Sequence, residues 1–144
     1  MDQVPESQGR IRVVTGVMPA VASDPVVTMP ARVRWRIISA IARYVTDANV
    51  ATRYARLRLI KAGVALGYYP LRNVMAANQA IECTWGAGTD VGHSSSETRN
   101  LGPLPVGMLL NDEWDVGVYT SGKQAADQWT ALTLLVEEWI EPLA

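Results

Sequence analysis

This sequence is poor in histidine and cysteine, the residues that supply imidazole bases, thiol nucleophiles and zinc ligands. The 144 residues include one histidine, His93, and one cysteine, Cys83. A zinc site needs three or four such ligands at characteristic spacings, which this composition does not supply. The segment 92–96, Gly-His-Ser-Ser-Ser, also lacks the Gly-x-Ser-x-Gly pattern of a nucleophile elbow. We therefore predict no catalytic residue, no metal and no cofactor, and we expect a solvated or interface His93 and a buried structural Cys83.

Two further patterns could suggest an enzyme. Gly86, Gly88 and Gly92 are spaced Gly-x-Gly-x-x-x-Gly, whereas a dinucleotide site needs Gly-x-Gly-x-x-Gly opening a helix. We interpret them as loop glycines within a long polar loop at 86–103, a length that is often functional or ordered by a partner. A glycosidase needs only two carboxylates across a cleft. The clustered acids are expected to form solvated strand faces instead, and they are Asp112, Glu113, Asp115, Glu137, Glu138 and Glu141.

The arginines form the most informative pattern. Arg34 and Arg36 alternate along one predicted strand, and Arg56 and Arg58 alternate along another. If these strands pair, four guanidinium groups crowd one surface, and like charges directly opposite one another are destabilising. We consider an intrachain ladder of ion pairs, a subunit or partner interface, and, least favoured, contact with a DNA backbone. The candidate interface residues are Arg10, Arg12, Arg34, Arg36, Arg56, Arg58, Glu137 and Glu138.

The distribution of charge supports protein contacts. Residues 1–72 contain eleven basic and four acidic residues, a net charge of +7, whereas residues 73–144 contain two basic and ten acidic residues, a net charge of −8. The total of −1 argues against a dedicated nucleic-acid binder, which usually carries a basic excess. A sandwich would interleave the two halves, within one subunit or between neighbours.

Composition places the chain among folded proteins of one domain. It is 49% hydrophobic and 19% charged, which is too apolar for a disordered chain. One cysteine cannot form an intramolecular disulfide. The polar start is unlike a signal peptide, and no apolar run approaches the roughly 18 residues of a membrane helix. We therefore expect no membrane partner and a protein that is made and kept, or assembled, in a reducing cytoplasm.

Alternation of apolar and polar residues predicts strands. It indicates strands over 32–46, 54–61, 64–70, 76–85, 113–120 and 129–140. Period two over 32–46 places Val33, Trp35, Ile37 and Ile41 on one face, and Ala62-Gly63 marks a hairpin break. The last segment also fits an amphipathic helix, although a strand is favoured. Many short strands with turns between them predict an all-β antiparallel sandwich of jelly-roll type over residues 32–144. The proline-rich residues 1–31 are expected to form an extended N-terminal arm that lies on a neighbour.

Two segments resemble small virion proteins of tailed bacteriophages. One is Tyr-Val-Thr-Asp-Ala-Asn-Val-Ala-Thr-Arg at 44–53, followed by Ala-Arg-Leu-Arg-Leu at 55–59. The other is Gly-Lys-Gln-Ala-Ala-Asp-Gln-Trp at 122–129, followed by Leu-Leu-Val-Glu-Glu-Trp at 134–139. In that group a related turn precedes an alternating strand, and a Gly-Asp-x-Trp type approach precedes the last strand. The sequence here has Ala126-Asp127-Gln128-Trp129, a small departure. The resemblance covers residues 32–140 and implies an all-β fold and a virion setting, but no catalytic residues.

The resemblance and the charge pattern together imply a non-enzymatic virion component. We expect a capsid decoration protein bound to the major capsid protein, homo-oligomeric, with a trimer favoured. The alternatives are a neck, tail or baseplate protein and a carbohydrate-binding module that recognises a receptor. In the last case Trp85, Trp129 and Trp139 are the candidate stacking residues. A carboxylate hydrolase is a third, less favoured hypothesis.

Overall fold

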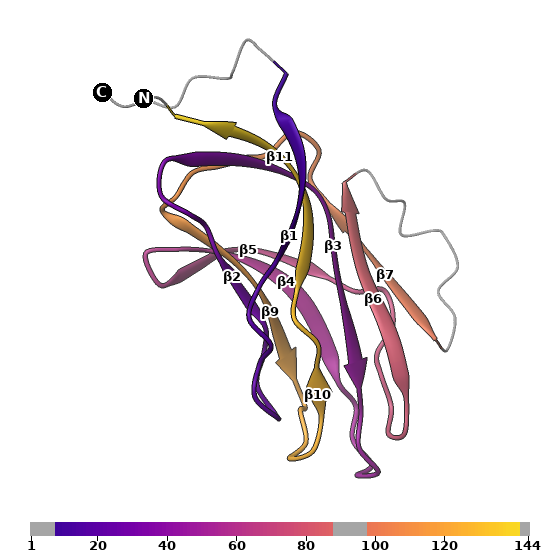
Figure 1. The fold of residues 1–144 in the computed structure, drawn as a ribbon. Helices are drawn as coiled ribbons and strands as arrows, with labels where there is room; N and C mark the ends of the chain where they lie inside the picture. The colour runs from indigo at the N-terminus through magenta and orange to yellow at the C-terminus, as the bar shows by residue number, and fades with distance from the viewer. Residues whose placement is uncertain (1–7, 88–97, 142–144) are drawn as a thin grey trace.

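The computed structural model describes residues 8–87 and 98–141, which fold into two packed β-sheets (Figure 1). The larger sheet has the order β1-β11-β3-β6-β7, and β8 and β10 also pair with β3. The smaller sheet has the order β2-β9-β4-β5. No described residue is helical, so no helix capable of crossing a membrane occurs among them. The strands are β1 (Arg10–Thr15), β2 (Val26–Thr28), β3 (Val33–Val45), β4 (Tyr54–Lys61), β5 (Val64–Pro70), β6 (Ala80–Ala87), β7 (Arg99–Leu104), β8 (Leu109–Leu110), β9 (Trp114–Ser121), β10 (Gln128–Trp129) and β11 (Thr133–Ile140).

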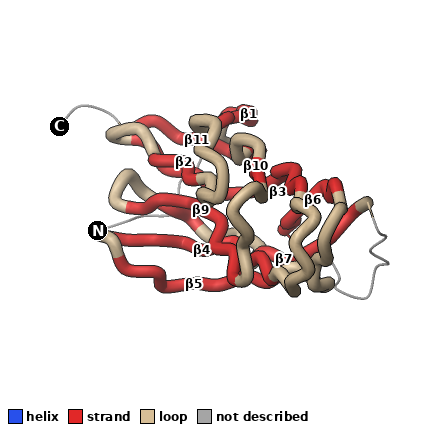
Figure 2. Tube along the Cα trace, turned by 90° about the horizontal axis from the view of Figure 1, so that it is seen from below, coloured by secondary structure: helices blue, strands red, loops and turns tan. Residues whose placement is uncertain are grey.

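The predicted all-β sandwich is confirmed. Figure 2 shows the strands of the smaller sheet lying beside one another as a layer next to the larger sheet. Large apolar side chains from both sheets fill the space between them, including the fully buried Trp35, Trp85 and Leu57. Most pairings are antiparallel, but β6 and β7 pair in parallel. The jelly-roll connectivity stays a prediction.

The hairpin of β4 and β5 follows its sequence pattern closely. Ala55, Leu57 and Leu59 are buried, as alternation predicts for one face of a half-buried strand. The connecting Ala62 and Gly63 both have positive φ, 50° and 78°. A two-residue turn with positive φ at both positions matches the right-handed twist of a hairpin, which explains the break that the sequence shows there.

Strand β3 departs from simple alternation. Val33, Trp35 and Ile37 are buried as predicted, but beyond them Ala40, Ala42 and Tyr44 are buried in place of Ile41. The cause is a register shift against β11, where Val136 pairs with Ile37 and Leu135 pairs with Ser39. The extra residue is Ile38. Because one inserted residue moves every later side chain to the opposite face, the predicted face assignment is wrong after this bulge.

The segment expected as an arm contributes strands to the sandwich. β1 pairs along its whole length with β11, and β2 pairs with β9. Gly16 lies between them, and its N–H donates to the carbonyl of Leu132 at 2.9 Å. The expected domain boundary at residue 32 therefore falls inside the sandwich, because each of these strands completes the hydrogen bonds of a neighbouring strand.

In the second half of the chain, the last segment and the long loop can each be set against their predictions. The last segment is a strand, β11, and not a helix. The predicted loop at 86–103 is shorter than expected, because β6 extends to Ala87 and β7 begins at Arg99. Gly88, Gly92 and His93 lie outside the described residues, so the predictions for them stay predictions.

Candidate interaction surface

Most of the candidate interface residues are paired with one another inside the chain. Strand β11 lies between β1 and β3, so its carboxylates face arginines on both neighbours. Glu138 is 3% exposed and points toward the core side of the sheet. It accepts hydrogen bonds from Trp35 Nε1 at 2.9 Å, Arg12 Nη1 at 3.0 Å and Arg10 Nη2 at 3.1 Å. Burial alone would raise the pKa of Glu138, but these hydrogen bonds outweigh it and hold its pKa below the ordinary value.

The side chain of Glu137 lies on the opposite face of the same strand. It is 6% exposed and pairs with Arg36 of β3, whose guanidinium also lies over the ring of Trp139. The N–H of Gly9 donates to Glu137 Oε1 at 2.8 Å. The hydrogen bond from Arg36 is the main reason that the pKa of Glu137 lies below its ordinary value. Arg34 similarly pairs with Glu141.

These contacts change the interpretation of the acidic cluster. The expected solvated face is wrong for Glu137 and Glu138, which are buried and neutralised by arginines from β1 and β3. Sequence alone did not indicate this, because the partners come from residues more than 100 positions away. Three alternatives were open for the arginines. Of these, the structure shows the intrachain ladder of ion pairs for Arg10, Arg12, Arg34 and Arg36.

A second buried ion pair lies at the end of the sandwich near β10. The guanidinium of Arg53 and the carboxylate of Asp127 are fully buried and meet at 2.7 Å between Nε and Oδ2. Arg53 also donates to Asp47 Oδ1 at 2.9 Å. The Tyr44 hydroxyl donates to Asp127 Oδ2 at 2.7 Å, and the backbone N–H groups of Gln124 and Asp47 complete the shell of Asp127.

The electrostatics of this cluster favour a fixed charge state. Burial would raise the pKa of Asp127, but the hydrogen bonds from Arg53, the backbone and Tyr44 outweigh it and hold the pKa well below its ordinary value. Burial and the hydrogen bond to Asp127 raise the pKa of Tyr44 well above its ordinary value. The cluster joins two segments far apart in the sequence, 44–53 and 122–129, and the Tyr44 ring stacks on Trp129 at 4.2 Å between centroids. These contacts hold the two segments together, and Asp127 matches the aspartate of the Gly-Asp-x-Trp pattern, whose departure lies at Ala126.

Arg56 and Arg58 are positioned differently from all of these arginines. They lie on β4 in the smaller sheet, whereas Arg34 and Arg36 lie on β3 in the larger one, so the four guanidinium groups do not share a surface. The condition that the two strands pair is not met, because β4 pairs with β5 and β9 instead. Alternation places Arg56 and Arg58 on the outer face, since the residues between them are buried.

Exposed tyrosines surround these two arginines. Arg56 lies over the rings of Tyr68 and Tyr119 at 5.4 and 5.6 Å, and Arg58 lies over Tyr119 at 5.3 Å. Tyr54, Tyr68 and Tyr119 are 52%, 49% and 39% exposed. We call Tyr54, Arg56, Arg58, Tyr68 and Tyr119 the Arg–Tyr face. The sequence shows Tyr54 alternating with both arginines, but Tyr68 and Tyr119 join them only through strand pairing.

Within the described residues, neither Arg56 nor Arg58 forms an ion pair with a carboxylate. The Nε atom of Arg58 is buried and has no hydrogen-bond acceptor there. Arginine and tyrosine are enriched in protein interfaces, where guanidinium groups bind carboxylates in a two-pronged geometry. The Arg–Tyr face can therefore accept an acidic partner surface, with the tyrosine rings providing apolar contact area.

A hollow of about 160 Å³ borders the Arg–Tyr face where β4 begins and β5 ends. Tyr54 and Arg56 belong to both features, and Pro70 and Arg72 contribute to the wall. The hollow adds relief to an otherwise flat sheet surface. Its size suits a side chain of a partner protein better than a drug-sized ligand, which occupies about 300 Å³ or more.

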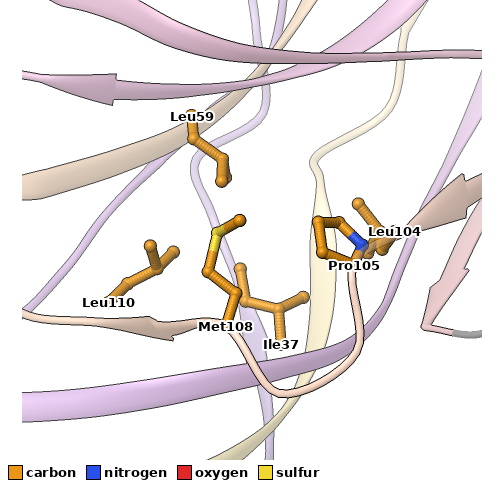
Figure 3. A pocket seen from close by; sticks show the side chains of 6 residues that line it. All are labelled: Ile37, Leu59, Leu104, Pro105, Met108 and Leu110. Atoms are coloured by element: carbon orange, nitrogen blue, oxygen red, sulfur yellow. The ribbon is translucent and has the colours of Figure 1, made fainter.

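A second hollow, between the sheets, is not a ligand site. Figure 3 shows Met108 pointing between Leu59 of the smaller sheet and Ile37 of the larger one. The free volume is about 10 Å³, close to the space of one water molecule, and its lining is apolar. The chain from Leu104 to Leu110 thus closes this end of the core. Met108 fills the gap between the sheets.

Several sequence-based predictions about chemistry can be tested on the described residues. Cys83 is fully buried, and burial raises the pKa of its thiol, so the predicted burial is confirmed. Trp85 and Trp129 are also fully buried, so neither can stack on a sugar. No group of His, Cys, Asp and Glu side chains within 8–87 and 98–141 could hold a metal ion.

Comparison with protein families, with curated proteins and with solved structures finds no match to this chain.

Proposed function

We propose that the protein is a structural component of a bacteriophage virion, a capsid decoration protein that binds the major capsid protein through its Arg–Tyr face. The single observation that carries the assembly role is the state of Arg56 and Arg58. Both lie on an open sheet face among exposed tyrosines and have no carboxylate partner among the described residues. The other candidate arginines have such partners within the chain.

The virion setting rests on the resemblance of two segments. Those segments supply the members of the buried Arg53–Asp127 cluster, including Tyr44 and Asp47, which supports a shared structural role for both motifs. The motifs hold the strand ends in place, and the Arg–Tyr face begins directly after Arg53 on β4. The resemblance therefore bears on the scaffold, whereas binding depends on the outer face.

The partner surface that fits the Arg–Tyr face is acidic. Two guanidinium groups on adjacent outward positions of β4 can each hold one carboxylate, and the pairs gain strength when binding excludes water. Truncating an arginine at the centre of an interface typically costs about 2 kcal/mol or more. Association should also weaken as salt rises, because exposed charges are screened.

The test is a charge reversal with a matched control. Arg56→Glu/Arg58→Glu is compared with Arg43→Glu, which changes an exposed arginine on β3 of the other sheet. Each purified protein is added to particles assembled without it, and the bound amount is measured. We expect the double variant to lose binding by at least about tenfold, since each such contact is worth a factor of ten or more. The Arg43 variant should bind like the wild type. Undiminished binding of the double variant would overturn the proposal.

Copy number separates decoration from other virion locations. Quantitative mass spectrometry of purified particles should find hundreds of copies for a decoration protein. A dozen copies or fewer would place the chain at the neck, tail or baseplate while leaving its structural role intact.

The alternative of a carbohydrate-binding module now depends on other residues. Burial removes Trp85 and Trp129 as stacking platforms. The half-buried Trp139 stays a candidate, and the exposed Tyr54, Tyr68 and Tyr119 join it. Glycan-array binding that is lost on Tyr68→Ala would favour this alternative. A flat array would leave the protein-binding proposal in place.

A further inference from the structure

The free edges of the two sheets are protected to very different degrees. Strand β2 has only three residues and lies between Pro25 and Pro30. Strand β7 is covered along its free side, where the N–H of Arg72 donates to the carbonyl of Leu101 at 2.9 Å. Strand β5 is interrupted by a register shift and ends in Pro70. Such features prevent edge-to-edge pairing.

Strand β1 has none of these protections. It is the last strand of the larger sheet, its six residues include no proline, and Ile11 and Val13 are 54% and 66% exposed. Figure 2 shows β1 beside β11 at one end of that sheet. An exposed, regular edge strand is a template for pairing with another strand.

The register identifies which backbone groups of β1 are free. The N–H of Gly16 donates to Leu132, so in this antiparallel pair residues 10, 12, 14 and 16 bond to β11. The hydrogen bond from the N–H of Glu141 to the carbonyl of Arg32 leads to the same conclusion. It shows that the backbone groups of odd-numbered residues in β11 face β3, so those of even-numbered residues face β1. The N–H and C=O groups of Ile11, Val13 and Thr15 therefore face away from the sheet.

Charge then restricts the register in which two copies of β1 can pair. Two copies of β1 can pair about a two-fold axis. Even-numbered residues then lie opposite even-numbered ones, and odd-numbered residues lie opposite odd-numbered ones. Centring the axis on Ile11 places Arg10 opposite Arg12, and centring it on Arg12 places that residue opposite itself. Both are unfavourable, because like charges lie directly opposite. Centring it on Val13 places Arg12 opposite Val14 and Arg10 opposite Gly16, and it lets all three free residues of each copy exchange hydrogen bonds.

We propose that β1 pairs antiparallel with β1 of a second copy of this chain, with Val13 on the two-fold axis. The larger sheet then continues from one copy into the other, and Ile11 of one copy faces Thr15 of its partner. Arg10 and Arg12 keep their ion pairs with Glu138, which lies on the opposite side of β1. The contact uses the same surface on both copies, so it closes at two subunits, whereas the sequence favours a trimer. It stands independently of the Arg–Tyr face.

A cysteine pair tests both the partner and the register. Cys83 is buried, so a new surface cysteine is the only accessible thiol among the described residues. Opposite residues of a hydrogen-bonded antiparallel pair have Cα atoms about 5.5 Å apart, which suits a disulfide. Val13→Cys should therefore give a disulfide-linked dimer under mild oxidation. Ile11→Cys is the matched control, because its two copies would lie about 13 Å apart along the strand. Equal cross-linking of the two variants would overturn the register.

Molecular mass in solution tests the pairing itself. By sedimentation, the wild-type chain should be a dimer at micromolar concentration. Val13→Pro removes an N–H that β11 does not use, and it should raise the dissociation constant of the dimer at least tenfold. Val13→Thr keeps the N–H and should remain a dimer. A monomeric or trimeric wild type would overturn the proposal, including a monomer whose β1 edge binds a different protein. Arg56→Glu/Arg58→Glu should remain dimeric, which separates this test from that of the proposed function.

Discussion

Arg53 and Arg56 lie three positions apart in the sequence and have opposite surroundings. Arg53 is fully buried against Asp127 and Asp47, in a cluster whose polar groups have partners. Arg56 lies on an outer sheet face between two tyrosine rings, with no ion pair among the described residues. The same residue type therefore serves stability in one place and can serve binding in the other. The difference lies in whether the chain itself supplies a carboxylate.

The largest effect on stability is expected for the buried pair of Arg53 and Asp127. Asp127→Ala leaves the guanidinium of Arg53 buried without its main partner and removes the acceptor of the Tyr44 hydroxyl. Breaking a buried pair in this way costs about 3–5 kcal/mol in the free energy of unfolding. Urea denaturation of this variant and of Glu113→Gln, an exposed partner of Lys61, measures the contrast. A loss of less than about 1 kcal/mol in Asp127→Ala would contradict the stabilising role assigned to the Arg53–Asp127 cluster.

Acid should weaken the protein through the same cluster and through the two buried carboxylates of β11. The pKa of Asp127, and those of Glu137 and Glu138, lie below their ordinary values in the folded state. The unfolded chain then binds more protons near pH 4, so the stabilisation is present above that pH and is lost as pH falls through the folded pKa values. A salt-bridged aspartate of this kind contributes on the order of 2–3 kcal/mol at neutral pH. Urea titrations between pH 7 and pH 3 should show the onset of this loss, and a flat profile would contradict it.

A smaller effect is expected at Glu138. Glu138→Gln keeps the size of the side chain but removes the charge that faces Arg10 and Arg12, while Trp35 can still donate to the amide oxygen. Both arginines are partly exposed, so solvent screens the pair, and we expect a loss of about 1–2 kcal/mol. Thermal unfolding measures it, with Glu141→Gln as the more exposed control.

The smallest effect on stability is expected on the Arg–Tyr face. Arg56→Gln and Arg58→Gln remove contacts with exposed tyrosine rings, which are worth about 0.5–1 kcal/mol each. Urea denaturation should find each variant within about 1 kcal/mol of the wild type. A loss of several kcal/mol would mean that this face is structural, and the contrast with Arg53 would disappear.

Local patterns predicted much of the framework. Alternation at 54–61 identified β4 and its inward residues, because hydrophobic burial on one face imposes period two on a strand. The Ala62-Gly63 hairpin followed from its turn residues. The face assignment of β3 failed after Ile38, because a bulge depends on the register with β11, which lies almost 100 residues further along the chain.

The candidate site was predictable only in part. The sequence identifies Arg56 and Arg58 as outward residues but does not reveal that Arg34 and Arg36 belong to the other sheet. Tyr68 and Tyr119 were missed because they reach the arginines across strand pairs. Glu137 and Glu138 were taken for solvated residues, although strands on both sides neutralise them.

The amino-acid sequence was sufficient for the all-β class, most strands, the buried thiol and the surplus of arginine in the first half, because these depend on composition and on period-two patterns along short segments. The tertiary structure alone decided which arginine meets a carboxylate, which tyrosines border Arg56, and that residues 10–15 form an edge strand. The physical reason is that charge neutralisation and edge exposure depend on pairing between segments far apart in the chain. Such pairing is set by the collective packing of two sheets, and no local pattern records it.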